Sequence, residues 1–293
     1  MRYYQLFAER FPTRIFNLKH TVESAQPLTF YAQYNRESNS LTYPTYNSII
    51  NVAFKGTEKE GELIAVSSTQ NFKNEIQRKF RLDDKMTNIY KHISTDKYMK
   101  EAIKEYYGMR LTYNDPWEAT LCFVVSQNNN VPRIRNIILK LIDTFGHPIK
   151  DENDVAIAKS FPSSGEILGA SIETLKACGT GFRARYIKAA ADFFTNNLSA
   201  KELSSKKYPE IKEILMEIDG IGDKVADCIA LMGCGKLEAF PIDTWSKKTL
   251  ERFYFHGKPQ KIDKLHDFAY DKWGKYAGYA QQYLFWYGRQ SKL

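Results

Sequence analysis

The spacing of apolar residues changes along the chain from a pattern typical of strands to one typical of helices. Before Asn71, short segments rich in β-branched and aromatic residues are separated by Asn, Ser, Gly and Pro. These segments predict an antiparallel sheet over residues 12–69. The strand segments are Arg14–Val22, Leu28–Tyr34, Ser48–Phe54 and Gly61–Ser68.

After Asn71 the apolar residues recur at helical spacing. Three successive helices are predicted over residues 72–80, 86–93 and 98–107. A further helix is expected to begin after Asp115, because a proline follows this capping residue and Glu118 completes a capping box. Its apolar continuation predicts a buried helix.

The predicted fold class is α+β, with an N-terminal antiparallel β-sheet subdomain followed by an all-α region. The sheet and its flanking helices are expected in residues 1–113, and the helical region in residues 114–293. A chain of 293 residues is long enough for two or three compact subdomains. No low-complexity linker or internal repeat appears, so we expect the subdomains to pack without a flexible tether.

A helix-hairpin-helix is predicted at about residues 209–233. One apolar stripe runs from Ile211 to Ile218 at helical spacing, and the same periodicity resumes beyond the hairpin. Between them, Gly220 and Gly222 admit backbone angles that a helix interior does not use. The start of the second helix presents unpaired N–H groups together with its positive dipole end, an arrangement that suits a phosphate.

A lysine and an aspartate near this hairpin are candidates for chemistry. Lys224 lies in the first turn of the second helix, where a cation opposes the helix dipole and the neutral amine is favoured. A neutral amine is a nucleophile that can form a Schiff base with a sugar C1′. Asp243 follows Pro-Ile and precedes another helical segment. Each residue also has a structural interpretation: a solvated charge for Lys224 and a helix N-cap for Asp243.

The composition of the chain indicates the charge of its binding partner and the setting in which it works. Lys and Arg total 42 against 34 Asp and Glu, and the resulting charge of +8 favours a polyanion. The four cysteines are scattered without a C-x-x-C pair, which argues against a zinc site, a disulfide framework or a C-terminal iron–sulfur cluster and fits a reducing setting. No membrane span or signal-peptide core is evident, so a cytoplasmic location is expected if the source is prokaryotic.

The run I-D-G-I-G-D-K-V-A-D, followed by P-I-D, resembles the helix-hairpin-helix (HhH-GPD) DNA glycosylase superfamily. The phrase G-I-G-D-K-V-A-D-C-I-A-L-M resembles in particular the 8-oxoguanine DNA glycosylase/AP lyases. The resemblance implies that Lys224 attacks the sugar while Asp243 stabilises developing positive charge. It implies a bifunctional repair enzyme that excises 8-oxoguanine from duplex DNA and nicks the abasic strand.

Further residues match the base pocket of this family. Cys228 lies one helical turn beyond Lys224, and Gln281 and Phe285 share one helix face. The resemblance implies that the amide bonds the Watson–Crick edge of the extruded base while the ring stacks on its plane. Ala25 stands where these enzymes have a glycine whose carbonyl receives the N7 hydrogen of the oxidised base.

Two segments match those that, in the 8-oxoguanine enzymes, occupy the gap left in the duplex by the extruded nucleotide. Asn128 belongs to an asparagine-rich stretch after the apolar helix, and the resemblance implies that it fills the place of the extruded nucleotide. The same resemblance implies that Arg133 and Arg183 meet the orphaned cytosine and that Phe182 is a wedge between bases. The structural alternatives are a turn between helices for the asparagine stretch and core packing for Phe182.

One departure concerns phosphate contacts. Trp245 stands near the position where human-type enzymes have a histidine, so the contact is expected to fall to Lys247 or Lys248. The expected partner is duplex DNA containing oxidised guanine, and one chain suffices. The chemistry requires no metal or organic cofactor, although hairpin carbonyls could hold a structural cation.

Two alternative functions stay open. A monofunctional glycosylase for alkylated bases would use Asp243 to activate water and leave Lys224 idle. A non-catalytic helix-hairpin-helix DNA-binding protein would use neither residue for chemistry.

Overall fold

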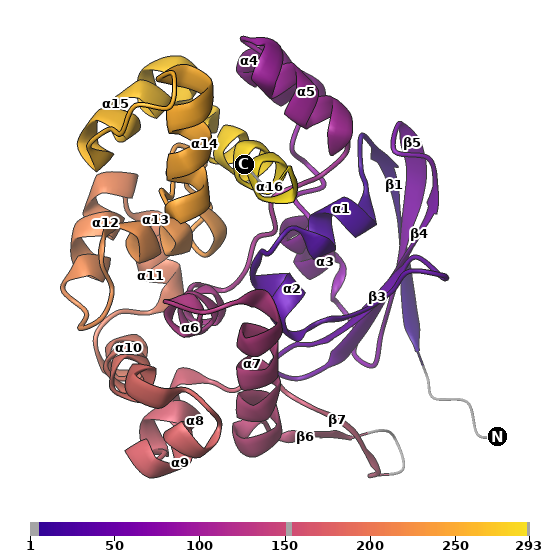
Figure 1. Ribbon diagram of the computed structural model, residues 1–293. Helices are drawn as coiled ribbons and strands as arrows, with labels where there is room; N and C mark the ends of the chain where they lie inside the picture. Colours follow the sequence, from indigo (N-terminus) through magenta and orange to yellow (C-terminus); the bar gives the residue numbers. More distant parts are fainter. Residues whose placement is uncertain (1–5, 151–153, 292–293) are drawn as a thin grey trace.

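A computed structural model describes residues 6–150 and 154–291 and places a five-stranded sheet beside a larger helical region (Figure 1). The spatial order of the strands is β1-β5-β4-β3-β2, and every neighbouring pair is antiparallel. The predicted fold class is therefore confirmed. The strands are β1 (Phe7–Arg14), β2 (Gln33–Asn35), β3 (Ser40–Pro44), β4 (Ile49–Gly56) and β5 (Glu60–Ser67).

Two of the four predicted strand segments are confirmed, as β4 and β5. The two earlier segments are wrong, because they contain the short helices α1 (Leu18–Glu23) and α2 (Pro27–Tyr31). Asn17 caps α1 by accepting a bond from the His20 amide at 3.0 Å, and Pro27 occupies the first position of α2. These local signals override the β-branched and aromatic composition of the two segments. The apolar side chains Leu18, Val22 and Leu28 are buried in the core from helices instead of strands.

The helices predicted after Asn71 are confirmed as α3 (Lys73–Lys79), α4 (Met86–Ile93) and α5 (Lys97–Glu105). Helix α6 (Pro116–Ser126) begins with the predicted capping box and is buried along most of its length. The helix-hairpin-helix is confirmed as α12 (Tyr208–Met216) and α13 (Asp223–Met232).

The remaining elements complete the helical region and add one small hairpin. They are α7 (Val131–Phe145), β6 (Pro148–Lys150), β7 (Ala156–Lys159), α8 (Ser164–Gly169), α9 (Ile172–Ala177), η1 (Gly181–Arg183), α10 (Ala184–Asn196), α11 (Ala200–Ser205), α14 (Thr244–Tyr254), α15 (Ile262–Trp273), η2 (Gly274–Tyr276) and α16 (Ala277–Gln290). Among the helices of the described ranges, none has both the length and the apolarity that a membrane crossing needs.

The last helix of the chain packs against the first part of it. Tyr283 on α16 donates to the Met109 carbonyl at 2.7 Å, and its hydroxyl also lies 2.8 Å from that of Tyr90 on α4. Gln282 reaches the Ser24 carbonyl at 2.8 Å. Helix α16 also packs on α14, which follows the helix-hairpin-helix. This one helix therefore fixes the N-terminal turn at Ser24 relative to α14.

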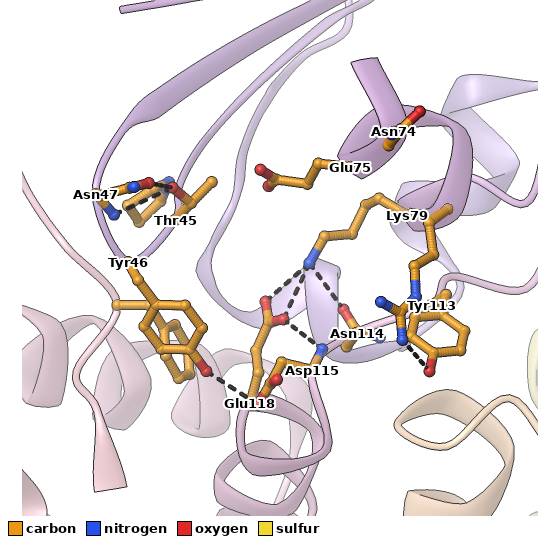
Figure 2. A pocket seen from close by; sticks show the side chains of 13 residues that line it. Thr45, Tyr46, Asn47, Asn74, Glu75, Lys79, Tyr113, Asn114, Asp115 and Glu118 are labelled. Atoms are coloured by element: carbon orange, nitrogen blue, oxygen red, sulfur yellow. Dashed lines mark hydrogen bonds and ion pairs between the residues drawn. The ribbon is translucent and has the colours of Figure 1, made fainter. Parts of the chain in front are cut away.

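A buried ion pair joins the sheet-bearing region to α6. The Lys79 ammonium on α3 lies 3.0 Å from Glu118 and 3.4 Å from the Asn114 side-chain oxygen (Figure 2). Both charged side chains are only 8% exposed. Burial lowers the pKa of Lys79 and raises the pKa of Glu118, so each charge depends on the other for its stability.

Replacing Lys79 with methionine should lower the free energy of unfolding by about 3–5 kcal/mol, because the Glu118 carboxylate would lose its buried counter-charge. The double variant Lys79→Met/Glu118→Gln removes both charges and should recover most of this loss. Chemical denaturation of the parent and both variants measures the difference. Equal destabilisation of the single and double variants would contradict this account.

Candidate active site

The residues predicted for catalysis and for the base pocket line one cavity of about 260 Å³. Its walls come from α2 and the turn before it, from the asparagine stretch and from α6, α7, α13, α14 and α16, which converge near the centre of the molecule (Figure 1). Lys224 and Asp243 therefore open onto a shared space, as the proposed chemistry requires. The predicted residues among the lining are Ala25, Lys224, Cys228, Asp243, Gln281 and Phe285.

A second, larger cavity of about 390 Å³ lies at the opposite end of α6 (Figure 2). It is bordered by Asp115 and Glu118, whereas the first cavity is bordered by Phe123 and Ser126 of the same helix. Glu118, which lines this larger cavity, accepts bonds from the Lys79 ammonium and the Asp115 amide. The smaller cavity is the candidate active site, because Lys224 and Asp243, the two residues predicted for catalysis, line it.

Lys224 lies in the first turn of α13, and its ammonium stands 5.4 Å from the centroid of the Phe123 ring. Cys228, one turn further on, is the other potential nucleophile on this wall. Burial raises the pKa of the Cys228 thiol to about 11, although the charge of Lys224 acts in the opposite direction. The thiol is thus protonated at neutral pH and does not offer a thiolate to the cavity.

Asp243 combines the two interpretations that its sequence context allows. It is the N-cap of α14, and its Oδ1 accepts a bond from the Ser246 amide at 2.7 Å. The same side chain lines the cavity. The cap holds the carboxylate in a defined orientation at the cavity wall, which is what charge stabilisation at a nearby sugar needs.

Gln281, which lines the cavity, has a side-chain acceptor without a partner in the described chain. Its Nε2 donates to the Ser246 hydroxyl at 3.0 Å, and this bond orients the amide. Its Oε1 is buried and has no hydrogen-bond partner within the described chain. A buried acceptor without a partner costs about 1–3 kcal/mol, so a ligand N–H that reached it would relieve this penalty. Phe285, one turn along α16, adds a partly exposed ring to the same wall.

Ala25 adopts the backbone conformation that favours glycine, with φ of +58°. The turn is held from both sides: Gln26 donates to the Ser24 hydroxyl at 2.9 Å, and Gln282 donates to the Ser24 carbonyl at 2.8 Å. Alanine therefore keeps the left-handed backbone at this position, and the residue borders the cavity.

The asparagine stretch is both a turn and an exposed feature. Asn130 caps α7 by accepting from the Arg133 amide at 3.1 Å. Asn128 and the Arg133 side chain are exposed, and Asn128 has a positive φ of +45°. Phe182 is 53% exposed, so the alternative that it packs into the core is wrong.

Two of the predicted DNA-contact residues, Arg183 and Lys247, already have partners within the protein. Arg183 is only 2% exposed, and its guanidinium donates to the carbonyls of Gln127 at 2.8 Å and Asn128 at 3.0 Å. It therefore fastens the asparagine stretch, and its contact with the orphaned cytosine stays a prediction. Lys247 is paired with Glu251 one turn along α14, because this carboxylate lies on the same helix face. Lys248 is the exposed neighbour.

The hairpin glycines differ in what surrounds them. Gly220 has a φ of +85°, and a Cβ atom there would lie 2.1 Å from the ring of Tyr186. Gly222 has a φ of −94° and open space around the same position, where it is the exposed N-cap of α13. Only Gly220 is required by backbone conformation and close packing.

Gly220→Ala should therefore cost about 2–4 kcal/mol of stability, from the left-handed backbone and the overlap with Tyr186. It should also weaken duplex binding, because the hairpin must shift. Gly222→Ala is the matched control and should cost less than about 1 kcal/mol. Thermal unfolding and fluorescence anisotropy with duplex DNA measure both quantities, and comparable losses in the two variants would refute the distinction.

The cavity lining also includes Trp245, which the sequence singled out only for its departure from the family histidine, and Arg289, which the sequence did not single out. Trp245 lies beside Asp243 at the start of α14, and Arg289 lies on α16. The Arg289 guanidinium is 6.0 Å from the centroid of the Phe285 ring. The four-residue spacing between these two positions was the available signal, because it puts them on one helix face.

Three potential metal ligands meet beside the hairpin, but a lysine stands among them. Asp223, Asp227 and His266 have ligand atoms within 4.8 Å of one another. The Lys212 ammonium lies 2.7 Å from Asp223 and 3.0 Å from Asp227. This cluster joins α12, α13 and α15 as an ion-pair network that supports the hairpin.

Comparison with known proteins agrees with this arrangement. Residues 10–120 match the family model described as the 8-oxoguanine DNA glycosylase N-terminal domain, and residues 121–270 match that of the HhH-GPD superfamily base excision DNA repair proteins. An N-glycosylase/DNA lyase of Saccharomyces cerevisiae is 29% identical over 263 residues, covering 76% of this chain and 69% of the relative.

Two solved structures are similar over almost the whole chain. MBOgg1 in complex with a low affinity DNA ligand shares 34% identity with a TM-score of 0.88, covering 100% of both chains. The Clostridium acetobutylicum 8-oxoguanine glycosylase/lyase, in complex with double-stranded DNA containing cytosine opposite 8-oxoG, shares 27% identity with a TM-score of 0.85, covering 98% of this chain and 99% of that one. The chain therefore belongs to the HhH-GPD superfamily of base excision DNA repair proteins, with an 8-oxoguanine DNA glycosylase N-terminal domain.

Proposed function

We propose that this protein excises 8-oxoguanine from duplex DNA and then nicks the abasic strand. The observation that carries the proposal is the convergence of Lys224 and Asp243 on one cavity that Gln281 and Phe285 also line. An amine, a carboxylate, an amide acceptor and an aromatic ring are the groups needed to act on one extruded nucleotide. The relatives named as N-glycosylase/DNA lyases and 8-oxoguanine glycosylases support the substrate.

DNA binding begins with the backbone of the duplex. The net charge of +8 favours a sequence-independent, salt-sensitive affinity. The amides at the hairpin and the start of α13 receive a phosphate, with Lys248 as a further cation. Phe182 then enters the base stack, and Asn128 fills the gap from which the damaged nucleotide leaves.

The extruded base enters the cavity beside α16. The Phe285 ring stacks on its plane, and the unpartnered Gln281 Oε1 accepts an N–H from its Watson–Crick edge. The carbonyl of Ala25 accepts the N7 hydrogen, which 8-oxoguanine has and guanine lacks. Discrimination against guanine thus depends on one hydrogen bond whose acceptor would be left without a partner.

Chemistry follows from the amine and the carboxylate. The Lys224 Nζ forms a bond to C1′ while the bond from C1′ to the base breaks, and the base leaves with the electron pair and takes up a proton. Asp243 stabilises the positive charge that develops on the sugar. Opening of the sugar gives a Schiff base, and loss of a C2′ proton then expels the 3′ phosphate. We propose that a single chain acts in this way on cellular DNA, in the cytoplasm if the source is prokaryotic.

The proposal is tested with the full chain and two duplexes that differ only in 8-oxoguanine or guanine opposite cytosine. Base release, strand nicking and a borohydride-trapped adduct are expected with the damaged duplex alone. Base release from an alkylated duplex without nicking or an adduct would instead indicate the monofunctional alternative. Binding without release of any base would indicate a non-catalytic DNA-binding protein.

A further inference from the structure

Three segments face the proposed DNA site: the asparagine loop (residues 126–130), the wedge turn (residues 180–183) and the catalytic hairpin (residues 219–224). Gln127 joins the first to the third, because its Nε2 donates to the Gly220 carbonyl at 2.7 Å. Arg183 joins the second to the first through the carbonyls of Gln127 and Asn128. Gln127 therefore contacts both other segments, one through its side chain and one through its backbone.

A second set of contacts joins the catalytic hairpin to the wedge turn through α10. The ring of Tyr186 on α10 packs so tightly on Gly220 that only a glycine fits there. The rings of Tyr186 and Phe182 are 6.2 Å apart in an edge-on arrangement, and the Arg183 guanidinium lies 4.5 Å from the Phe182 centroid. The hairpin, α10, the wedge turn and the asparagine loop thus form a closed loop of contacts.

We propose that Gln127 is a positioning residue that couples insertion of Phe182 to the alignment of Lys224. When the base stack displaces the wedge turn, the bonds of Arg183 shift the backbone of Gln127. The side-chain amide of Gln127 then shifts the Gly220 carbonyl, which precedes Lys224 by four residues. Chains of packed side chains and hydrogen bonds are the kind of network that carries coupling between sites. The inference rests on the proposed function, because it takes Lys224 as the nucleophile.

The test is the variant Gln127→Met, which keeps the length of the side chain and removes its donor. The backbone carbonyl that receives Arg183 is unchanged, so only the bond to the hairpin is lost. Loss of one such bond should slow single-turnover base release about tenfold, with little change in melting temperature or duplex affinity. Gln77→Met is the matched control, because Gln77 lies on α3 at a separate surface cavity.

A double-mutant cycle separates coupling from a merely structural role. Phe182→Ala should slow base release strongly in the parent and much less in Gln127→Met, because the coupling is already lost there. Equal effects of Phe182→Ala in both backgrounds would overturn the proposal. So would a Gln127→Met defect that is confined to melting temperature and duplex affinity.

A second readout does not depend on base excision. Hydrogen exchange of residues 217–224 is followed as the protein binds undamaged duplex DNA. Phe182→Ala should reduce the protection of this segment in the parent but not in Gln127→Met, and equal reductions would overturn the coupling. If the parent releases no base, the proposed function fails while this measurement still decides the coupling.

Discussion

Lys224→Gln should abolish the borohydride-trapped adduct and slow release of 8-oxoguanine by roughly a thousandfold or more, since glutamine cannot form the bond to C1′. The amide is nearly as long as the amine's stem and still fits against the Phe123 ring. Duplex affinity should fall by less than about tenfold, because one cation among many is removed. Base release by gel assay and adduct formation measure the two effects.

A matched control removes the same charge elsewhere. Lys176 is exposed on α9 and does not line the cavity, so Lys176→Gln should leave adduct formation and base release at the parent level. An adduct that persists in Lys224→Gln would show that another amine is the nucleophile. Undiminished base release without an adduct would show that water attacks instead.

Asp243→Asn should slow base release by about a hundredfold or more while the protein stays folded and binds duplex DNA. The reason lies in the dual role of this residue. Asparagine caps a helix as well as aspartate does, so the bond to the Ser246 amide and the start of α14 persist. The substitution therefore removes the negative charge beside the sugar and little else.

The matched control is Asp115→Asn, the same change at another helix N-cap. Asp115 begins α6 and accepts a bond from the Trp117 amide at 2.9 Å, but it borders the other cavity. This variant should retain base release and melting temperature close to the parent values. A comparable loss of base release in both variants would mean that the charge of Asp243 has no special role.

Local signals were sufficient where a residue acts within its own segment. The capping box at Asp115 and the glycines of the hairpin predicted α6, α12 and α13, because capping and positive φ are properties of a few neighbouring residues. Composition failed over Arg14–Val22 and Leu28–Tyr34 for a related reason. In those segments Asn17 and Pro27 begin short helices whose apolar side chains pack on the sheet, and burial suits either conformation.

A long-range contact determines which partners the Arg183 guanidinium has within the protein. Arg183 sits in a motif that implies contact with a base, yet its guanidinium is occupied by carbonyls of the asparagine loop. Lys247 was a candidate for phosphate binding, and Glu251, four residues along the same helix, pairs with it at a spacing that the sequence itself shows. For Arg183, by contrast, the acceptors come from a segment more than fifty residues away, and spacing along the chain does not give that.

The sequence alone determined the chemistry that the protein can offer: a lysine at the start of one helix, an aspartate at the cap of another, and an amide and a ring on one face of a third. Each of these follows from contacts within a few residues. Only the tertiary structure decided that the three helices open onto one cavity, that the Gln281 oxygen there lacks a partner, and that Gln127 ties the hairpin to the wedge. Gln127 contacts Gly220 and Arg183, and each of these partners lies more than fifty residues away along the chain. Packing between such distant segments is set by burial of the whole core.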